Sequence, residues 1–174
     1  MSDWPDLRPV LRDIPWAVAG GVATRAYMPE RATKDLDILV RHDDGDEVRE
    51  RLEAAGYKFV TPLAVPGFLV RSPEGVEIDV ILGDYVWLDE ALAHIRRDPA
   101  GLPVLDLPYL VIMKIDASRV QDTADLSRML GLASDETLEQ VRAVVARHVP
   151  DAVDDLESLI YLGKVEMRDV VRNA

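Results

Sequence analysis

Three aspartates in apolar surroundings are the residues of this chain best suited to chemistry. Asp35 and Asp37 stand one residue apart in the segment DLDILV, and Asp79 stands between Ile78 and Val80 in VEIDVIL. Alternate residues of a β-strand point to the same face, so a strand over DLDILV would project both of its carboxylates together. Two carboxylates held this close repel each other, and burial raises the cost. The pair therefore requires a counter-charge.

A divalent cation is the counter-charge that fits this pattern. Mg²⁺ prefers oxygen ligands and is usually bound by one or two protein carboxylates plus substrate phosphates and water. If VEIDVIL lies beside DLDILV in a sheet, Asp79 completes a three-carboxylate cluster able to hold one or two metal ions for phosphoryl transfer. Glu77 shares the predicted face with Asp79 and is an alternative ligand. The competing interpretation is an edge strand whose acidic side chains face solvent.

A glycine pair precedes the first two aspartates. Gly20 and Gly21 lie between a predicted strand, WAVAG, and a predicted short helix, GVATRAYM. Glycine lets the backbone approach a ligand closely, and a helix N-terminus favours phosphate. Together with the aspartates, the pair predicts a phosphate-binding loop beside a metal site.

The elements that must position these residues follow from periodicity and turn signals. A helix is predicted over residues 3–14, a second helix in DGDEVRERLEAAG, and a third in DYVWLDEALAHIRR. The runs GFLVRS and VEIDVIL, joined by PEG, predict a hairpin, and LPVLDL predicts a short strand. After Pro108 the pattern is helical throughout, in PYLVIMKIDASRV, DTADLSRMLGL, SDETLEQVRAVVARHV, DAVDDLESLIYLGKV and MRDVVRN.

This order predicts an α/β (α+β) fold with a small mixed sheet flanked by helices. We expect an α/β core over residues 1–107 and a helical region over 108–174 packed on it, because no linker rich in Gly or Ser separates the two.

Composition narrows the function. The chain has no cysteine, which excludes disulfides, thiolate catalysis and cysteine-based zinc sites. Its net charge of −12 weighs against DNA binding. No segment has the length of a membrane span, and the N-terminus lacks the pattern of a secretory leader, so a cytoplasmic location is expected.

The segment VAGGVATRAYMPERATKDLDILV resembles the signature of the polymerase-beta-like nucleotidyltransferase superfamily. That signature is an apolar residue, a Gly-Gly or Gly-Ser pair, a short gap, and then Asp-apolar-Asp/Glu-apolar. The resemblance implies that Asp35 and Asp37 bind Mg²⁺ and that Gly20 and Gly21 hold the triphosphate of a nucleotide. It also implies that Asp79 binds a second metal ion or helps to deprotonate the acceptor hydroxyl.

Two branches of this superfamily are most similar. The segments LEAAGYKFV and VEIDVILGD are similar to the small antibiotic nucleotidyltransferases, and RATKDLDI with MKIDASRVQDTADL is similar to the toxins of the AbiEii type. In the toxins, a lysine and a following aspartate of the helical half belong to the active site, and Lys114 and Asp122 match that pattern. Next to the metal pair, Arg31, Thr33 and Lys34 are expected to contact phosphates.

Some of these residues also have structural interpretations. Lys114 follows an apolar run, where its amine either reaches water or meets an acid or a phosphate. Asp122 and nearby Asp125 are also suited to the first turn of a helix. Tyr27 and Tyr85 are expected near the site, where each either stacks on a base or packs in the core.

The combined prediction is a metal-dependent enzyme that moves a nucleoside monophosphate from an NTP to a hydroxyl and releases pyrophosphate. The acceptor is a small molecule, a tRNA end or a protein hydroxyl, which leaves both antibiotic resistance and a toxin–antitoxin system open. A non-catalytic antitoxin-like or regulatory module is the alternative. Neither DNA nor a membrane is an expected partner, whereas a second copy of the chain or a cognate antitoxin is.

Overall fold

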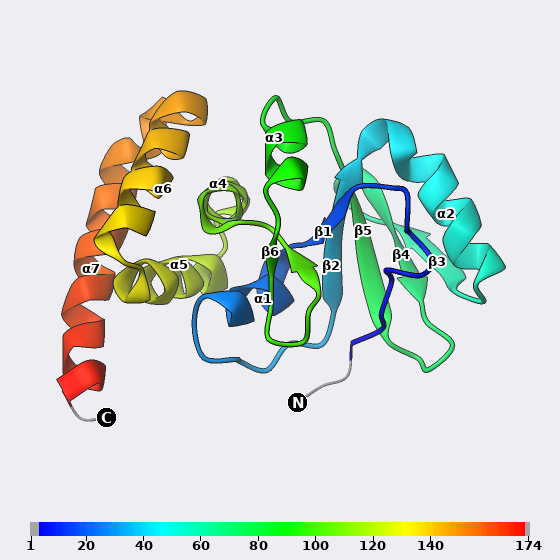
Figure 1. The fold of residues 1–174 in the computed structure, drawn as a ribbon, viewed down its shortest axis with the longest axis horizontal. Coiled ribbons are helices and arrows are strands. Elements are labelled where there is room, and N and C mark those ends of the chain that lie inside the picture. The colour runs from blue at the N-terminus through cyan, green and yellow to red at the C-terminus, as the bar shows by residue number, and fades with distance from the viewer. Residues whose placement is uncertain (1–3, 173–174) are drawn as a thin grey trace. The chain divides into compact units, whose positions relative to one another are not determined.

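The structure is a computed structural model that describes residues 4–172, with side chains placed through residue 167. The chain forms two compact units. The first comprises the chain up to Ala26 together with Glu30–Leu105, and the second comprises Tyr27–Pro29 and the residues from Asp106 onward. Figure 1 shows that the β-sheet belongs to the first unit, whereas the second is helical.

A seven-stranded sheet forms the centre of the first unit. Its strands are β1 (Trp16–Val18), β2 (Leu36–Arg41), β3 (Lys58–Pro62), β4 (Gly67–Arg71), β5 (Glu77–Gly83), β6 (Arg96–Arg97) and β7 (Pro103–Val104). They lie in the order β3-β4-β5-β2-β1-β7-β6. The pairs β2–β5 and β1–β7 are parallel and the others antiparallel, so the sheet is mixed. The predicted α/β fold is confirmed.

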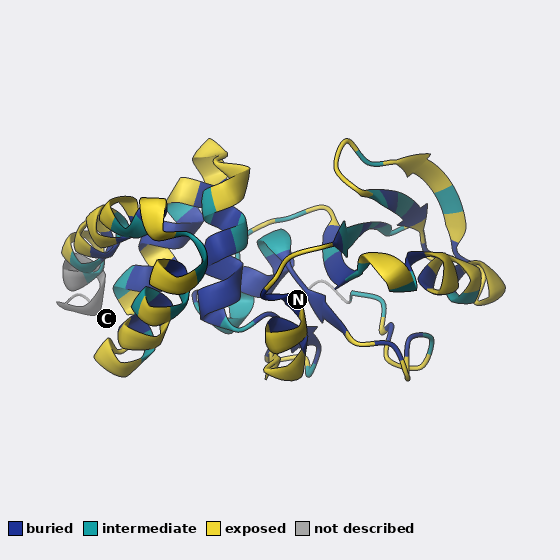
Figure 2. Ribbon diagram, turned by 90° about the horizontal axis from the view of Figure 1, so that it is seen from above, coloured by how far each residue is buried: buried dark blue, intermediate teal, exposed yellow. Residues whose placement is uncertain are grey.

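One face of the central strands is apolar because side chains alternate along them. Ile38 of β2 and Val80 of β5 are register partners on this face, and both are fully buried. Helix α2 (Gly45–Ala54) covers the same face: a Cβ at Gly45 would lie 2.9 Å from the Leu82 side chain. Figure 2 shows the central strands buried and the outer side of α2 exposed. The aspartates of β2 and β5 alternate with these residues and occupy the opposite face.

The N-terminal segment departs from its predicted structure. In the described part of residues 3–14 the chain forms turns rather than a helix, although the Leu11 amide donates to the Leu7 carbonyl at 2.8 Å. Pro5 and Pro9 explain the difference, since a proline has no N–H to donate to a helical ladder. The turns still bury Leu7 and Leu11.

Two further predicted helices of the first unit are shorter than expected. GVATRAYM yields only α1 (Gly20–Ala23), followed by the 3-10 turn η1 (Thr24–Ala26). DYVWLDEALAHIRR yields α3 (Leu88–Ala93), and its last two residues, Arg96–Arg97, form strand β6 instead. Arg96 and Arg97 pair with β7, and this long-range contact outweighs their local helix propensity. The sequence pattern does not reveal such a contact.

The second unit is helical, as predicted. Its helices are α4 (Leu107–Ala117), α5 (Val120–Leu132), α6 (Asp135–His148) and α7 (Val153–Arg172), with the 3-10 turn η3 (Pro150–Ala152) before α7. The last two predicted segments form one helix, and Asn173 lies outside the described residues. Figure 2 shows that α4 is buried along most of its length, unlike the outward faces of α6 and α7.

Helices α5 and α7 touch at two glycines. A Cβ on Gly163 would lie 2.0 Å from the Ser127 carbonyl oxygen, and one on Gly131 would lie 2.4 Å from the Gly163 carbonyl oxygen. Both obstacles are backbone atoms, which cannot rotate away. The Ser127 hydroxyl also hydrogen-bonds to the Glu166 carboxylate at 3.0 Å across the same contact.

We therefore expect Gly163→Ala to destabilise the protein by about 1–3 kcal/mol through overpacking, although alanine is normally the better helix former. Urea unfolding measures the effect, and Ser158→Ala, an exposed position on the same helix, is the control with a change of less than about 0.5 kcal/mol. A higher unfolding midpoint for Gly163→Ala than for the wild type would contradict this helix contact.

Candidate active site

The two strands that carry the aspartates are neighbours inside the sheet. Asp37 of β2 and Asp79 of β5 are direct register partners in a parallel pair, and β4 and β1 flank them on either side. Adjacent strands lie about 4.8 Å apart, and register partners point to the same face. The edge-strand interpretation is therefore wrong, and the two carboxylates share one face of the sheet.

Asp35 lies outside the strand in which it was predicted. Strand β2 begins at Leu36, so Asp35 is the residue just before it and is exposed, whereas Asp37 and Asp79 are half-buried. The acidic residues thus stand where β2 and β5 begin, within reach of water. Ionised carboxylates are much less costly in such a position than in the middle of a buried strand.

The electrostatics of Asp79 show that the acids still repel. Partial burial raises the pKa of Asp79 above its ordinary value, and the negative charges of Asp35 and Glu77 raise it further. Glu77 itself accepts a hydrogen bond from Arg71 at 2.7 Å, across the β4–β5 pair. Among the described residues, no hydrogen bond or ion pair neutralises Asp79. Of the two alternative ligands on β5, Asp79 is the one without a cation.

Gly20 lies directly against Asp37. A Cβ at Gly20 would lie 1.9 Å from Asp37 Oδ2. The backbone of Gly20 has a φ of +58°, a left-handed conformation in which a residue with a side chain is strained. The Ala19 amide donates to the Asp37 carbonyl at 2.9 Å and fixes this approach. Both the close contact and the backbone conformation favour glycine here, so the glycine pair lies directly against the Asp37 carboxylate.

Two of the three residues predicted to contact phosphates surround the second glycine. A Cβ at Gly21 would lie 3.0 Å from Thr33 Oγ1 and 3.1 Å from Arg31 Nη2. Lys34 is exposed, next to Asp35. Helix α1 has only four residues, so any phosphate binding here depends on the glycine backbone and these side chains rather than on a long helix.

The carboxylates of the site match the donor chemistry of a magnesium site only in part. Within residues 4–167, no group of three Asp, Glu, His or Cys side chains is arranged to hold a metal ion. The donor chemistry nevertheless fits Mg²⁺, which commonly takes one or two carboxylates and completes its shell with phosphate oxygens and water. The uncompensated Asp79 and the cradle formed by Gly20 around Asp37 are consistent with that arrangement. The three-carboxylate metal cluster remains a prediction.

A buried ion pair behind the glycine loop was missed by the sequence analysis. Arg25, in η1, forms an ion pair with Asp98, and its Nε donates to Asp98 Oδ2 at 2.5 Å. The other oxygen of Asp98 accepts from the amides of Ala100 and Leu102 at 2.9 and 2.8 Å. This pair ties the turn after the glycines to the β6–β7 connection. An arginine in the largely apolar segment GVATRAYM was the available signal.

In the second unit, the predicted residues Lys114 and Asp122 are in contact. Helix α4 ends at Ala117, and Ser118, with a φ of 51°, reverses the chain into α5. Lys114 Nζ then donates to Asp122 Oδ1 at 2.7 Å and to Asp125 Oδ2 at 2.9 Å.

These groups have little access to water. Lys114 is 3% exposed and Asp125 0%, so the amine does not reach solvent. Asp122 lies in the first turn of α5, as its structural interpretation expected, and it is buried there. Burial acts to raise the pKa of Asp122, but hydrogen bonds from Arg119 and Lys114 outweigh it and hold that pKa below its ordinary value. The charge of Lys114 is already balanced within the second unit, and a catalytic role for Lys114 and Asp122 stays a prediction.

Tyr85 is not at the carboxylates. Tyr85 follows the far end of β5 from Asp79 and stacks on Trp87, with ring centroids 4.6 Å apart. Tyr27 belongs to the second unit, and its hydroxyl lies 3.5 Å from Asp106 Oδ1. The expectation that Tyr85 lies near the site is wrong, because β5 separates it from Asp79 by several residues.

None of the described helices is long and apolar enough to cross a membrane.

A mixed sheet with adjacent acidic strands behind a Gly-Gly turn is the architecture of the polymerase-beta-like nucleotidyltransferase superfamily, and that resemblance is confirmed. The sequence model of the aminoglycoside-2''-adenylyltransferase family matches residues 10–99, a little more than half of the chain, and the protein belongs to this family. The match covers the strands that carry Asp37 and Asp79. It supports the antibiotic branch of the resemblance, while the toxin-like branch stays a prediction.

Similar solved structures include two antibiotic-modifying proteins. The solution structure of the antibiotic-resistance factor ANT(2'')-Ia is 15% identical, with 94% of this chain and 90% of that chain covered and a TM-score of 0.47. The lincomycin-bound crystal structure of the lincosamide antibiotic adenylyltransferase LnuA is 14% identical, with 78% and 92% covered and a TM-score of 0.46. No curated protein sequence matches this chain. The family assignment rests on the sequence match.

The raised pKa of Asp79 predicts that its negative charge costs stability. When a carboxyl has a higher pKa in the folded than in the unfolded state, the protein loses stability as the pH rises through the folded-state pKa. The folded protein then gives up a proton that it held more tightly than the unfolded chain does. In chelator, we therefore expect Asp79→Asn to have a higher Tm than the wild type at pH 7. The difference should shrink below about pH 3, where the carboxyl is protonated in both states.

Thermal unfolding at the two pH values measures this difference, with Asp43→Asn, a fully exposed side chain, as the control that leaves Tm unchanged. A lower Tm for Asp79→Asn than for the wild type at pH 7 would show that Asp79 is compensated within the folded protein.

Removal of the buried charge of Lys114 is expected to destabilise the protein, in contrast to removal of the Asp79 charge. Lys114→Met removes the ammonium group that donates to the fully buried Asp125 carboxylate at 2.9 Å, so we expect a loss of about 3–5 kcal/mol. The double variant Lys114→Met/Asp125→Leu should recover much of this loss, because no unpaired charge then remains at that position. Urea unfolding measures both, with exposed Lys58→Met as the control. A single variant as stable as the wild type would mean that the pair does not support the fold.

Proposed function

We propose that this protein transfers AMP from ATP to a hydroxyl of an aminoglycoside and releases pyrophosphate, with Mg²⁺ as the metal. The observation that carries the proposal is the junction of Gly20 with Asp37, beside its register partner Asp79. The family match supplies the adenylyl group and the class of acceptor. ANT(2'')-Ia, whose structure contains adenylyl-2''-tobramycin, is consistent with the same chemistry.

In the proposed reaction the acceptor oxygen attacks the α-phosphorus of ATP. A new oxygen–phosphorus bond forms, the bond from the α-phosphorus to the bridging oxygen breaks, and pyrophosphate leaves with that oxygen. Asp35, Asp37 and Asp79 would hold Mg²⁺, which when bound neutralises phosphate charge and aligns the triphosphate. The backbone at Gly20 and Gly21, with Arg31, Thr33 and Lys34, would bind the phosphates.

Asp79 would also receive the proton of the acceptor hydroxyl. No hydrogen bond or ion pair among the described residues occupies its carboxylate, which leaves that carboxylate free to accept a proton. Binding a second metal ion is the alternative role for the same residue. This assignment is the part of the proposal that depends most on the position of Asp79 beside Asp37.

The charge of the protein supports a cationic acceptor. Aminoglycosides carry several ammonium groups, which a chain of net charge −12 attracts, whereas the same charge repels an RNA backbone. Lincosamides, tRNA and protein hydroxyls are the alternative acceptors, and a non-catalytic module is the alternative to an enzyme. Nothing in the glycine junction or the carboxylates suggests loss of activity, so the enzymatic interpretation is preferred.

The test is a transfer assay with each of the four NTPs against tobramycin, lincomycin and tRNA, with Mg²⁺ or chelator. We expect tobramycin with ATP to gain one adenylyl group by mass, with stoichiometric pyrophosphate, only when Mg²⁺ is present. Asp37→Asn should lower the rate by at least about a hundredfold, because the variant loses a ligand of the Mg²⁺ that would neutralise the phosphate charge. Asp43→Asn, on the exposed segment after β2, should retain the wild-type rate.

Each contrary outcome points elsewhere. Transfer to lincomycin or tRNA but not to tobramycin would overturn the acceptor, and a different NTP would overturn the adenylyl group. Absence of transfer to any acceptor, with intact folding, would favour the non-catalytic module. An Asp37→Asn variant as active as the wild type would remove the carboxylates from the mechanism.

A further inference from the structure

The turn that carries the glycine pair is anchored by the two residues of η1 that follow it. Thr24 is 1% exposed and the Arg25 side chain 7%, so both lie in the interior of the first unit. The Thr24 hydroxyl donates to the Gly21 carbonyl at 2.8 Å. The position of Gly21 is therefore linked to the residues that come after it in the chain.

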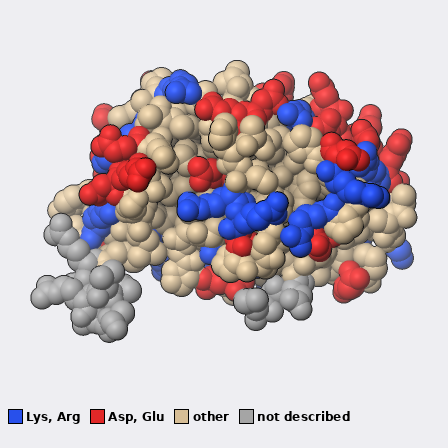
Figure 3. All heavy atoms as spheres, in the orientation of Figure 1, with Lys and Arg blue, Asp and Glu red and all other residues tan. Residues whose placement is uncertain are grey.

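A buried guanidinium group requires a compensating acid, and Asp98 supplies it. The Asp98 side chain is fully buried, and its Oδ2 accepts from Arg25 Nε at 2.5 Å. Its Oδ1 accepts from two backbone amides of the β6–β7 connection, which fix the carboxylate in place. The arginines of β6 itself, Arg96 and Arg97, are exposed, and Figure 3 shows basic side chains gathered on that face. Arg25 thus differs from them in being paired in the interior.

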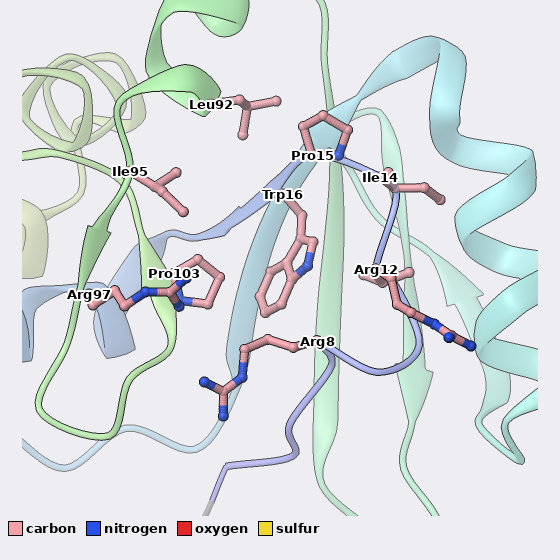
Figure 4. Close-up of a pocket in the computed structure, with 10 residues that line it drawn as sticks. Arg8, Arg12, Ile14, Pro15, Trp16, Leu92, Ile95, Arg97 and Pro103 are labelled. Atoms are coloured by element: carbon pink, nitrogen blue, oxygen red, sulfur yellow. The ribbon is translucent and has the colours of Figure 1, made fainter.

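The β6–β7 hairpin that holds Asp98 is also joined to the strand that leads into the glycine pair. Val104 of β7 pairs with Val18 of β1, and the Leu105 amide donates to the Val18 carbonyl at 3.0 Å. Pro103 of β7 and Trp16 of β1 line the same pocket, with a volume of about 300 Å³ (Figure 4). The hairpin is therefore connected to the chain both before and after the glycines, through β1 and through η1.

Arg25 is also linked to the segment that carries the other proposed phosphate contacts. Its Nη1 lies 3.7 Å from Glu30 Oε1, next in sequence to Arg31. This segment stands against the second glycine, because a Cβ at Gly21 would lie 3.0 Å from Thr33 Oγ1 and 3.1 Å from Arg31 Nη2. One guanidinium group is consequently paired with acids of both the hairpin and the segment beside Gly21.

From these contacts we infer that Arg25 is a positioning residue for the phosphate-binding loop. With Asp98 and Glu30 as its partners, it holds Gly21 and the segment of Arg31 and Thr33 in the arrangement that binds a triphosphate. This inference rests on the proposed function and extends it from the groups that contact the nucleotide to the group that arranges them. A loop that is fixed before its ligand arrives loses less entropy on binding. Loss of the anchor should therefore weaken the binding of ATP.

The first test measures adenylyl transfer at varied ATP concentration. We expect Arg25→Met to raise the KM for ATP about tenfold or more and to change kcat less than about threefold, because the loop binds the phosphates in the ground state and in the transition state alike. Arg25→Lys keeps a positive charge beside Asp98 and should recover part of the affinity. Leu52→Ala is the control: it leaves a cavity beneath α2 and destabilises the fold, but should change this KM by less than about twofold.

A double variant separates positioning from folding. In Arg25→Met/Asp98→Asn no unpaired charge remains, and the asparagine oxygen can still accept from the two backbone amides, so Tm should return most of the way to the wild-type value. The KM for ATP should stay raised, because the ion pair that fixes the turn is still missing. A double variant that regains the wild-type KM together with the wild-type Tm would show a purely structural role and overturn the inference.

Amide hydrogen exchange without nucleotide tests the loop independently of transfer. The amides of Ala23 and Thr24 are hydrogen-bonded within the turn and should exchange about tenfold faster in Arg25→Met and in the double variant, but not in Leu52→Ala. Unchanged exchange in both Arg25 variants would overturn the inference, whatever the wild type transfers. Faster exchange in these variants, with a wild type that transfers no nucleotide, would support the anchoring role of Arg25 and overturn the proposed function alone.

Discussion

The negative charge gathered around Asp79, on an inner strand of the sheet, is the constraint on which the candidate active site depends. Asp37 and Asp79 are register partners, and the pKa of Asp79 is raised by burial and by the charges of Asp35 and Glu77. The charge of Asp79 is unfavourable in the protein alone and would become favourable with a metal ion bound beside it. Gly20 preserves the space around Asp37, because any Cβ at that position would overlap the carboxylate. The site is therefore expected to gain stability from its ligands.

Other buried charges of the protein are compensated internally, and this contrast separates structural from functional groups. Asp98 is bound by Arg25 and two amides, and Lys114 is bound by Asp122 and Asp125. Burial alone does not identify a catalytic group, since each of these charges has its counter-charge in place. Asp79 differs because its neighbours raise rather than lower its pKa. The uncompensated residue is the more reasonable candidate for chemistry, and the compensated ones for holding the fold.

The first unit uses both faces of its sheet. One face of the central strands is covered by α2, through contacts such as Gly45 with Leu82, and the other carries the acidic residues. A pocket beside Trp16 lies at the opposite end of the strands from Asp37, and the sheet separates the two by strand length and by face.

The sequence alone determined the main strands, the helices of the second unit and the superfamily. Alternating apolar residues specified β2 and β5, and their Asp-apolar-Asp and Ile-Asp-Val patterns with Gly-Gly identified the nucleotidyltransferase superfamily, because side-chain period and glycine geometry are local properties. The helices of the second unit were also readable from their periodicity. Only tertiary structure decided which strands are neighbours, that Asp35 lies just outside β2, that Arg96–Arg97 form a strand, and that Arg25 meets Asp98. It also decided that Lys114 is enclosed by Asp122 and Asp125. These features depend on contacts between distant segments, whose free energy outweighs local propensity and leaves no periodic trace in the sequence.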